Sequence, residues 1–274
     1  MALVSFQAHI RHSHCIAPVT SVGDNTRAVN KPGISIVAPA HEEAESLPEL
    51  VRSVENAFAA FDAWELIVVD DGSRDNTAGV LAGLQSEHPR LRVVRHLNNR
   101  GQSAAMCTGA DAARFAWLGF LDADGQNDPA DLAKLYSEML EAGDTAPGMI
   151  MGHRQERKDG WLTRSSSRIA NAVRAGLLRD RTPDTGCSLK VLARDDFLAM
   201  PRFDHMHRFL PALLLRQGLQ TVSRPVAHYP RRAGRSKYGL GNRLWVGIAD
   251  LLGVWWLGRR RFRPGKSEEI RHDD

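Results

Sequence analysis

Residues 117–124 read Trp-Leu-Gly-Phe-Leu-Asp-Ala-Asp, an apolar run that ends in two carboxylates separated by one residue. The apolar part predicts a buried strand, and in an extended chain residues two apart point to the same side. Asp122 and Asp124 can therefore face one cation. Because Mg²⁺ and Mn²⁺ favour a few carboxylates together with water and phosphate oxygens, we predict a metal–diphosphate site here. An ordinary acidic turn is the alternative interpretation.

A second apolar run, Leu66–Val69, also ends in two acids, Asp70 and Asp71, which precede a Gly-Ser turn. Carboxylates at this point could accept hydrogen bonds from a base or ribose, or help to hold a metal. They could equally form an Asx turn and cap the next helix. Taken alone, this second acidic strand end leaves both readings open.

Short apolar runs alternate with helical patterns between residues 33 and 121. Strands are expected at 34–38, 66–69, 91–95 and 117–121, and helices at 47–61, 75–86 and 102–114. This alternation predicts an α/β fold with a mostly parallel sheet covered by helices on both faces. Ligands of such sheets bind beyond the carboxyl ends of the strands, where residues 39–43, 70–75 and 122–128 would meet.

The pattern after residue 150 is less regular. We expect helices at about 162–178, 208–217 and 240–258, and strands near 187–192 and 220–227. The sequence shows neither an internal repeat nor a linker between the two halves. A single domain with an elaborated C-terminal region is therefore predicted.

Charge is distributed unevenly along the 274 residues, whose formal net charge is +4. Residues 1–150 contain 11 Lys and Arg against 20 Asp and Glu, whereas residues 151–264 contain 23 against 8. The acidic half could hold a cation and the basic half could meet an anionic partner. A solvated, Arg-rich surface is the alternative.

Composition excludes several classes of protein. Hydrophobic residues make up 43% of the chain, enough to bury a core. Cys15, Cys107 and Cys187 lie far apart, which argues against a disulfide scaffold and favours a reducing compartment. No apolar run reaches the roughly 20 residues that span a bilayer.

Three segments resemble the donor-site motifs of family 2 glycosyltransferases. They are Ile-Val-Ala-Pro-Ala-His-Glu-Glu at 36–43, Val-Val-Asp-Asp-Gly-Ser-Arg-Asp-Asn-Thr at 68–77 and Leu-Asp-Ala-Asp-Gly-Gln-Asn-Asp-Pro at 121–129. Their order and spacing match over roughly 33–150, and the resemblance implies the GT-A fold. One position departs from the pattern, because His41 stands where the family usually has Asn.

Within the family, the chain is similar to the polyprenyl-phosphate glycosyltransferases, the group that contains dolichol-phosphate mannose synthase and bacterial undecaprenyl-phosphate sugar transferases. Residues 228–238, His-Tyr-Pro-Arg-Arg-Ala-Gly-Arg-Ser-Lys-Tyr, resemble that group's H-x-P-R-x-x-G-x-S-K-Y segment. Residues 101–104 and 124–126 resemble its bacterial branch. The resemblance implies an inverting transfer of one sugar from a UDP- or GDP-sugar to a polyprenyl (undecaprenyl or dolichyl) phosphate, with Mg²⁺ or Mn²⁺.

The resemblance also implies a role for each matching residue. Asp122 and Asp124 would bind the metal and the donor diphosphate, and Gln126 would sit beside the transferred sugar. The donor site would comprise Pro39, His41, Glu42, Asp70, Asp71 and Gln102. The acceptor phosphate would be held by Arg231, Ser236, Lys237 and, as a weaker candidate, Arg208.

The acceptor assignment has a physical basis as well. Residues 231–237 supply four cations, one hydroxyl and a glycine, and such groups suit a phosphate monoester. A basic surface loop is the alternative, and nucleic acid is disfavoured because aromatic residues for stacking are few. Phosphate is ionised near neutral pH, so no strong general base is needed, and Asp184 is the fallback. Cys107 and Cys187 are interpreted as packing residues, and the histidines 153, 205 and 207 as structural or solvated rather than catalytic.

Residues 244–258 are almost wholly apolar, include three tryptophans and precede an Arg-rich segment. A helix of this length rises only about 22 Å, less than the roughly 30 Å hydrocarbon core. Tryptophan and arginine suit an anionic membrane interface. We therefore predict a cytoplasmic protein attached peripherally to the inner face of the cytoplasmic membrane. A core helix, or a contact between copies of the chain, is the alternative.

These interpretations divide the chain into four parts. We expect a flexible leader at 1–32, a GT-A domain at 33–240, an amphipathic helix at 241–264 and a polar tail at 265–274. The domain would have a donor half to about residue 150 and an acceptor half from 151. Two other functions stay open: a family 2 transferase acting on a glycan or protein, and a non-catalytic module that binds membrane surfaces. A nucleotidyltransferase is disfavoured, because its Gly-rich, Lys-containing loop is missing from the N-terminal part.

Overall fold

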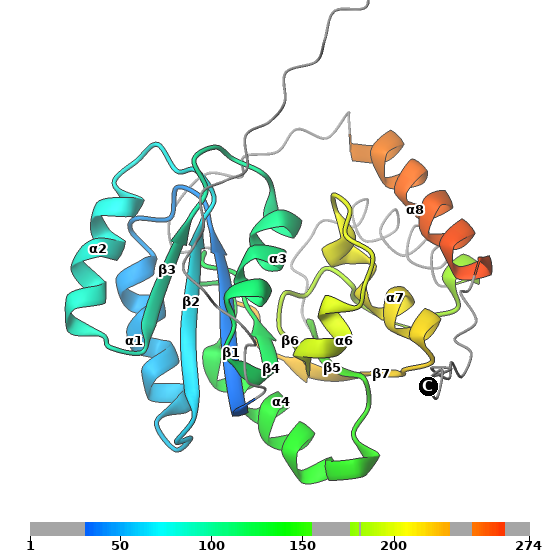
Figure 1. Ribbon diagram of the computed structural model, residues 1–274, viewed down its shortest axis with the longest axis horizontal. Coiled ribbons are helices and arrows are strands. Elements are labelled where there is room, and N and C mark those ends of the chain that lie inside the picture. Colours follow the sequence, from blue (N-terminus) through cyan, green and yellow to red (C-terminus); the bar gives the residue numbers. More distant parts are fainter. Residues whose placement is uncertain (1–30, 155–175, 181, 231–242, 261–274) are drawn as a thin grey trace, which may run out of the picture.

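The computed structural model describes residues 31–154, 176–180, 182–230 and 243–260 (Figure 1). Its strands are β1 (Lys31–Ala40), β2 (Trp64–Asp70), β3 (Leu91–Arg95), β4 (Phe115–Phe120), β5 (Met149–Arg154), β6 (Lys190–Ala193) and β7 (Thr221–Val226). Its α-helices are α1 (Leu47–Phe58), α2 (Thr77–Glu87), α3 (Gln102–Ala112), α4 (Pro129–Ala142), α6 (Arg194–Leu198), α7 (Leu210–Gln217) and α8 (Arg243–Arg259). Two short 3₁₀ helices, η1 (Gly143–Thr145) and η2 (Met206–Arg208), complete the described elements.

The seven strands form one sheet in the order β3-β2-β1-β4-β6-β5-β7. Strands β1 to β4 are parallel to one another, as the alternating pattern predicts. Strand β6 runs antiparallel to both β4 and β5, and β7 is parallel to β5. The predicted α/β class with a mostly parallel sheet is therefore confirmed, and β6 is the antiparallel strand that joins the two halves.

Helices cover both faces of the sheet and create two cores (Figure 1). Helices α1, α2 and α4 contribute to one core, and α3, α6 and α7 contribute to the other. Alternate residues of β1 enter opposite cores, Ile36 on one side and Val37 on the other. This arrangement explains why the buried strand β2 reads as a nearly continuous apolar run.

Helix α3 packs closely on β1 because it carries a glycine at the contact. A Cβ atom added to Gly109 would lie 2.3 Å from a side-chain carbon of Val37. The close approach sets the position of the whole helix. Its first residue, Gln102, consequently lies beyond the carboxyl ends of the parallel strands.

The structure contains elements that the sequence pattern did not predict, namely α4, β5 and α6. Helix α4 has a recognisable start signal, because the Asp128 side chain accepts a hydrogen bond from the Ala130 amide and proline follows it. Strand β1 begins at Lys31, inside the expected leader, whose first 30 residues lie outside the described ones. Of the helix expected at 162–178, only 176–178 are described, and they are helical.

Helix α8 lies at the edge of the molecule beside α7 (Figure 1). Val254 is buried against the core, and the Asp250 carboxylate lies 3.1 Å from Nδ1 of His205. Among the helices that the structure describes, none has both the length and the hydropathy needed to cross a bilayer.

Candidate active site

The carboxyl ends of β1, β2 and β4 meet at one edge of the sheet. Ala40 pairs with Asp70 across β1 and β2, and Val37 pairs with Phe120 across β1 and β4. Asp71 follows β2 directly, and Asp122 lies two residues after the end of β4. The side chains at this edge therefore come from the three segments in which the sequence predicted ligand contacts.

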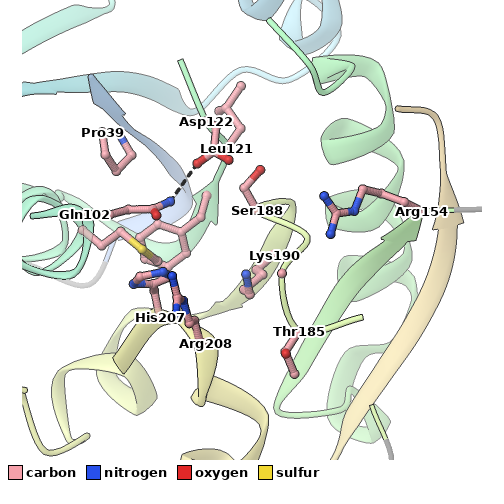
Figure 2. Close-up of a pocket in the computed structure, with 13 residues that line it drawn as sticks. Pro39, Gln102, Leu121, Asp122, Arg154, Thr185, Ser188, Lys190, His207 and Arg208 are labelled. Atoms are coloured by element: carbon pink, nitrogen blue, oxygen red, sulfur yellow. Dashed lines mark hydrogen bonds between the residues drawn. The ribbon is translucent and has the colours of Figure 1, made fainter. Parts of the chain in front are cut away.

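A cavity of about 470 Å³ opens beside Asp122 (Figure 2). Four of the predicted site residues line it, namely Pro39, Gln102, Asp122 and Arg208. The cavity is also lined by Arg154, Ser188, Lys190 and His207, none of which is among the predicted site residues. Arg154 and Lys190 enter through β5 and β6, so they reach the cavity only because β6 pairs with β4.

Asp122 is held in place by its neighbours. Its Oδ1 accepts a hydrogen bond of 2.8 Å from Nε2 of Gln102, drawn as a dashed line in Figure 2. Burial, and then the nearby charge of Asp124, raise the pKa of Asp122 to about 6, although Lys190 and a hydrogen bond with Ser188 act in the opposite direction. Two like charges are thus packed together at the end of β4.

Asp124 and Gln126 shape the turn after β4. The Asp124 side chain is 6% exposed, and its Oδ1 accepts a hydrogen bond from the Gln126 amide. Two hydrogen bonds tie Gln126 to Tyr229: the Tyr229 amide donates to the Gln126 carbonyl at 2.9 Å, and Nε2 of Gln126 donates to the Tyr229 carbonyl at 3.4 Å. The chain that leads into residues 231–237 therefore starts beside the acidic turn. Arg231, Ser236 and Lys237 themselves lie outside the described residues.

Asp71 and Asp70 are engaged by the protein at the end of β2. The Asp71 carboxylate accepts hydrogen bonds from the amides of Arg100 and Gly101 and lies 2.6 Å from Nδ1 of His96. Asp70 accepts a hydrogen bond from the Ser73 amide and pairs with Arg95. These contacts anchor the segment that leads into Gln102, so the acids also have a positioning role.

The turn after β1 is bonded to the turn after β2. The Glu42 amide donates to Oγ of Ser73, and the Glu43 amide donates to Oγ1 of Thr77. Glu42 adopts a positive φ of 53° there. His41 precedes it at the same turn, so the predicted donor residues of this segment stand beside those of β2.

The basic residues of the cavity differ in their partners. Arg154 forms a bidentate pair with Asp184, with N–O distances of 2.7 and 2.9 Å. Lys190 is 3% exposed and donates to the Cys187 carbonyl, and burial lowers the pKa of its ammonium group. Burial also raises the pKa of the Cys187 thiol, which suits a packing residue. Asp184, the fallback base, is thus paired with Arg154.

His207 gives the protein a pH-dependent stability. Burial and the charges of Lys190 and Arg208 lower the pKa of His207 to about 3, and Nδ1 lies 2.8 Å from Oγ of Ser103. Because the unfolded chain takes up a proton near pH 6.5 that the folded chain refuses, stability falls as the pH drops below that value, by up to about 1.4 kcal/mol per pH unit.

We expect His207→Asn to remove this contribution. Urea unfolding at pH 7.5 and pH 5.0 should show a smaller loss of stability on acidification for the variant than for the wild type. An identical pH dependence for the two proteins would show that His207 does not resist protonation in the fold.

The residues present fit a divalent ion that is shared with a ligand. Asp122 and Asp124 carry the kind of hard oxygen ligands that Mg²⁺ and Mn²⁺ favour, and they could supply them to such an ion. Among the residues that the structure describes, no group of three or more His, Cys, Asp or Glu side chains could hold a metal. A pair of carboxylates that leaves positions for diphosphate oxygens and water is the kind of site expected for a nucleotide-dependent ion.

The family model described as glycosyl transferase family 2 matches residues 35–199, which contain the acidic strand ends and most of the cavity. The chain belongs to glycosyltransferase family 2. It is 35% identical over 257 residues to a dodecaprenyl-phosphate galacturonate synthase from Rhizobium johnstonii, covering 91% of this chain and 73% of that protein. It is also 35% identical over 210 residues to an undecaprenyl-phosphate 4-deoxy-4-formamido-L-arabinose transferase from Sodalis glossinidius, of which it spans 63%.

Solved structures confirm the fold of this glycosyltransferase. A mannosyltransferase from Pyrobaculum calidifontis, in complex with GDP-Man and Mn²⁺, has a TM-score of 0.59 at 19% identity, covering 88% of this chain and 67% of that one. Glucosyl-3-phosphoglycerate synthase from Mycobacterium tuberculosis, in complex with UDP, has a TM-score of 0.62 at 21% identity, with coverages of 84% and 82%. At these identities the likeness concerns the fold alone.

Proposed function

We propose that this family 2 glycosyltransferase moves one sugar from a nucleotide diphosphate to a polyprenyl phosphate. The observation that carries the proposal is Asp122, which lines a cavity with cationic walls and is followed by the buried Asp124 at the end of β4. The relatives from Rhizobium and Sodalis, whose names specify polyprenyl-phosphate products or acceptors, support the acceptor class. Acceptors of the glycan or protein type have no comparable support.

The site residues divide the reaction between them. Asp122 and Asp124 would hold a divalent ion, which when bound would offset the charge that grows on the leaving diphosphate. Gln102 keeps Asp122 oriented through its 2.8 Å hydrogen bond. Pro39, His41, Glu42, Asp70 and Asp71 surround the strand ends where the nucleotide would lie.

Gln126 holds Tyr229 beside the acidic turn, so the acceptor phosphate would approach on the side of the turn where Tyr229 lies. An oxygen of the acceptor phosphate attacks the anomeric carbon as the bond to the nucleotide diphosphate breaks. The bonding electron pair leaves with the diphosphate. The configuration at that carbon inverts. Since the phosphate is already ionised, positioning supplies most of what the protein must contribute. Arg231, Ser236, Lys237 and Arg208 are the proposed phosphate ligands.

A transfer assay tests this function. The purified protein would be incubated with a short polyprenyl phosphate, Mn²⁺ or Mg²⁺ and a panel of UDP- and GDP-sugars, and the organic phase analysed by mass spectrometry. We expect a lipid-phosphate monosaccharide that disappears on chelation of the metal. Metal-dependent binding of a nucleotide sugar without a lipid product would move the acceptor to a glycan or protein.

We also propose that α8 attaches the enzyme to the surface of the membrane that holds its acceptor, the inner face of the cytoplasmic membrane. Ile248, Leu252 and Trp256 are 41%, 54% and 54% exposed and recur every four residues, so they form one stripe on the helix. Arg259 and Arg260 stack on Trp255 and Trp256, with guanidinium carbons 4.2 and 5.7 Å from the ring centroids. An apolar stripe ending in tryptophan and arginine suits an interface of anionic lipid.

The combined change Leu252→Ser and Trp256→Ser should weaken binding to vesicles of phosphatidylglycerol and phosphatidylcholine by about tenfold or more. It removes two exposed apolar side chains that would be buried in the lipid on binding. Cosedimentation measures the bound fraction. Leu140→Ser is the matched control, since Leu140 is 47% exposed on α4. Equal binding by the double variant and the control would rule out α8 as the membrane contact.

A further inference from the structure

Lys190 lies buried in the wall of the cavity beside Asp122. It begins β6, pairs with Phe120 of β4 and is only 3% exposed. Figure 2 shows its side chain among the cavity residues, with His207 and Arg208 on one side and Ser188 on the other. The one hydrogen bond that the structure gives its amine goes to the Cys187 carbonyl.

An ammonium group has three donors, and burying it is costly unless an anion compensates the charge. The charge of the Arg154 guanidinium is compensated by the Asp184 carboxylate, with N–O distances of 2.7 and 2.9 Å. Within the part of the chain that the structure describes, neither Lys190 nor Arg208 forms an ion pair with a carboxylate. Asp122 and Asp184 act on Lys190 only at longer range, and Asp122 is assigned to the metal. The cavity therefore offers unused positive charge to a ligand.

The order of the strands indicates which part of the substrate reaches this charge. Part of the sheet has the strand order β2-β1-β4-β6. The proposed nucleotide site lies at the ends of β1 and β2, on one side of β4. Lys190 lies in β6, on the other side of β4. With the diphosphate placed at Asp122 and Asp124 beyond β4, the sugar would extend from it toward β6. Lys190 would then face the sugar rather than the base.

We propose that the transferred sugar is a hexuronate, whose carboxylate binds to Lys190. This inference rests on the proposed function, because it assumes that the cavity holds the sugar of a nucleotide donor. A carboxylate would satisfy the free donors of Lys190 through charge-assisted hydrogen bonds. A neutral hexose offers no such acceptor to Lys190, which disfavours that donor.

Matched donor pairs that differ only at C6 test the proposal: UDP-glucuronate against UDP-glucose, UDP-galacturonate against UDP-galactose, and GDP-mannuronate against GDP-mannose. Binding to the full chain in Mn²⁺ is measured by calorimetry, and transfer to a polyprenyl phosphate by kcat/KM. We expect the wild type to prefer one uronate over its hexose by roughly tenfold to a hundredfold, the range of a charge-assisted hydrogen bond.

The variant Lys190→Met should abolish that preference, because it removes the contact with the uronate carboxylate and so weakens binding of the uronate donor. Lys190→Arg should keep part of the preference. Lys134→Met is the control for loss of one lysine charge, because the Lys134 side chain is 75% exposed. Thermal unfolding establishes that each variant is folded, and methionine suits the buried position by size and polarity.

Three results would overturn the proposal. One is a wild-type preference for neutral hexoses. Another is an equal decrease in kcat/KM for hexose and uronate donors in Lys190→Met, together with a raised KM for the acceptor. That result would assign Lys190 to the acceptor phosphate. The third is absence of the uronate preference in calorimetry. Because calorimetry needs no acceptor, a uronate preference that depends on Lys190 but yields no lipid product would instead count against the proposed function.

Discussion

Asp122→Asn and Asp124→Asn are each expected to lower the rate of sugar transfer by about a thousandfold or more. Each change removes one carboxylate of the proposed metal site, and electrostatic stabilisation of the leaving group is worth several kcal/mol in such sites. Asparagine keeps the size of the side chain, so the hydrogen bonds from Gln102 and the Gln126 amide can persist. The measurement is kcat at saturating donor and Mn²⁺.

The stability of these variants distinguishes catalysis from folding. Burial and the charge of Asp124 raise the pKa of Asp122 to about 6, so the ionised carboxylate is unfavourable in the fold. Asp122→Asn should therefore unfold at the same urea concentration as the wild type, or a higher one. Asp144→Asn is the matched control, because Asp144 is exposed in η1. Wild-type transfer by either site variant would remove the metal assignment.

The second large effect is expected for Asp71→Ala, which should lower the free energy of unfolding by about 3 kcal/mol or more. Asp71 is 3% exposed, and its carboxylate contacts His96 and the amides of Arg100 and Gly101. Each buried partner left without its acceptor costs about 1–3 kcal/mol. Urea denaturation measures the loss, and Asp62→Ala, an exposed acid before β2, serves as the control.

The same variant should weaken the active site indirectly. The segment that Asp71 anchors runs into Gln102, whose side chain orients Asp122. Asp71→Ala should therefore also raise the KM for the donor in conditions where the protein stays folded. A variant with wild-type stability and wild-type KM would show that the contacts of Asp71 are dispensable.

The first half of the domain was predictable because its signals are local. Each parallel strand is a short apolar run followed by polar residues, and parallel strands end at a common edge. The positions of Asp71 and Asp122 beside that edge follow from this regularity. Helix α4 was not among the predicted elements, although Asp128 and Pro129 give it a recognisable start.

The second half was harder because its strands pair out of chain order. Strand β6 lies between β4 and β5, and it is antiparallel to both. No local pattern specifies such an insertion, since the pairing partners are distant in the sequence. The cavity residues Arg154 and Lys190 could not be assigned to the site for that reason.

Helix α8 combines a composition that the sequence reveals with an exposed face that only packing determines. Its composition of apolar residues, tryptophan and arginine is visible in the sequence. Packing on the core decides which side is covered: Val254 is buried, whereas Leu252 and Trp256 remain exposed.

The sequence by itself determined the family, the α/β class and the acidic strand ends, because alternating apolar runs and short motifs are properties of neighbouring residues. Only the tertiary structure decided which cations face Asp122. Lys190 reaches the cavity through pairing between β6 and β4, and its burial without a carboxylate partner among the described residues depends on packing from several elements. Charge in a cavity is set by side chains that converge from distant segments, and that convergence is a property of the folded chain.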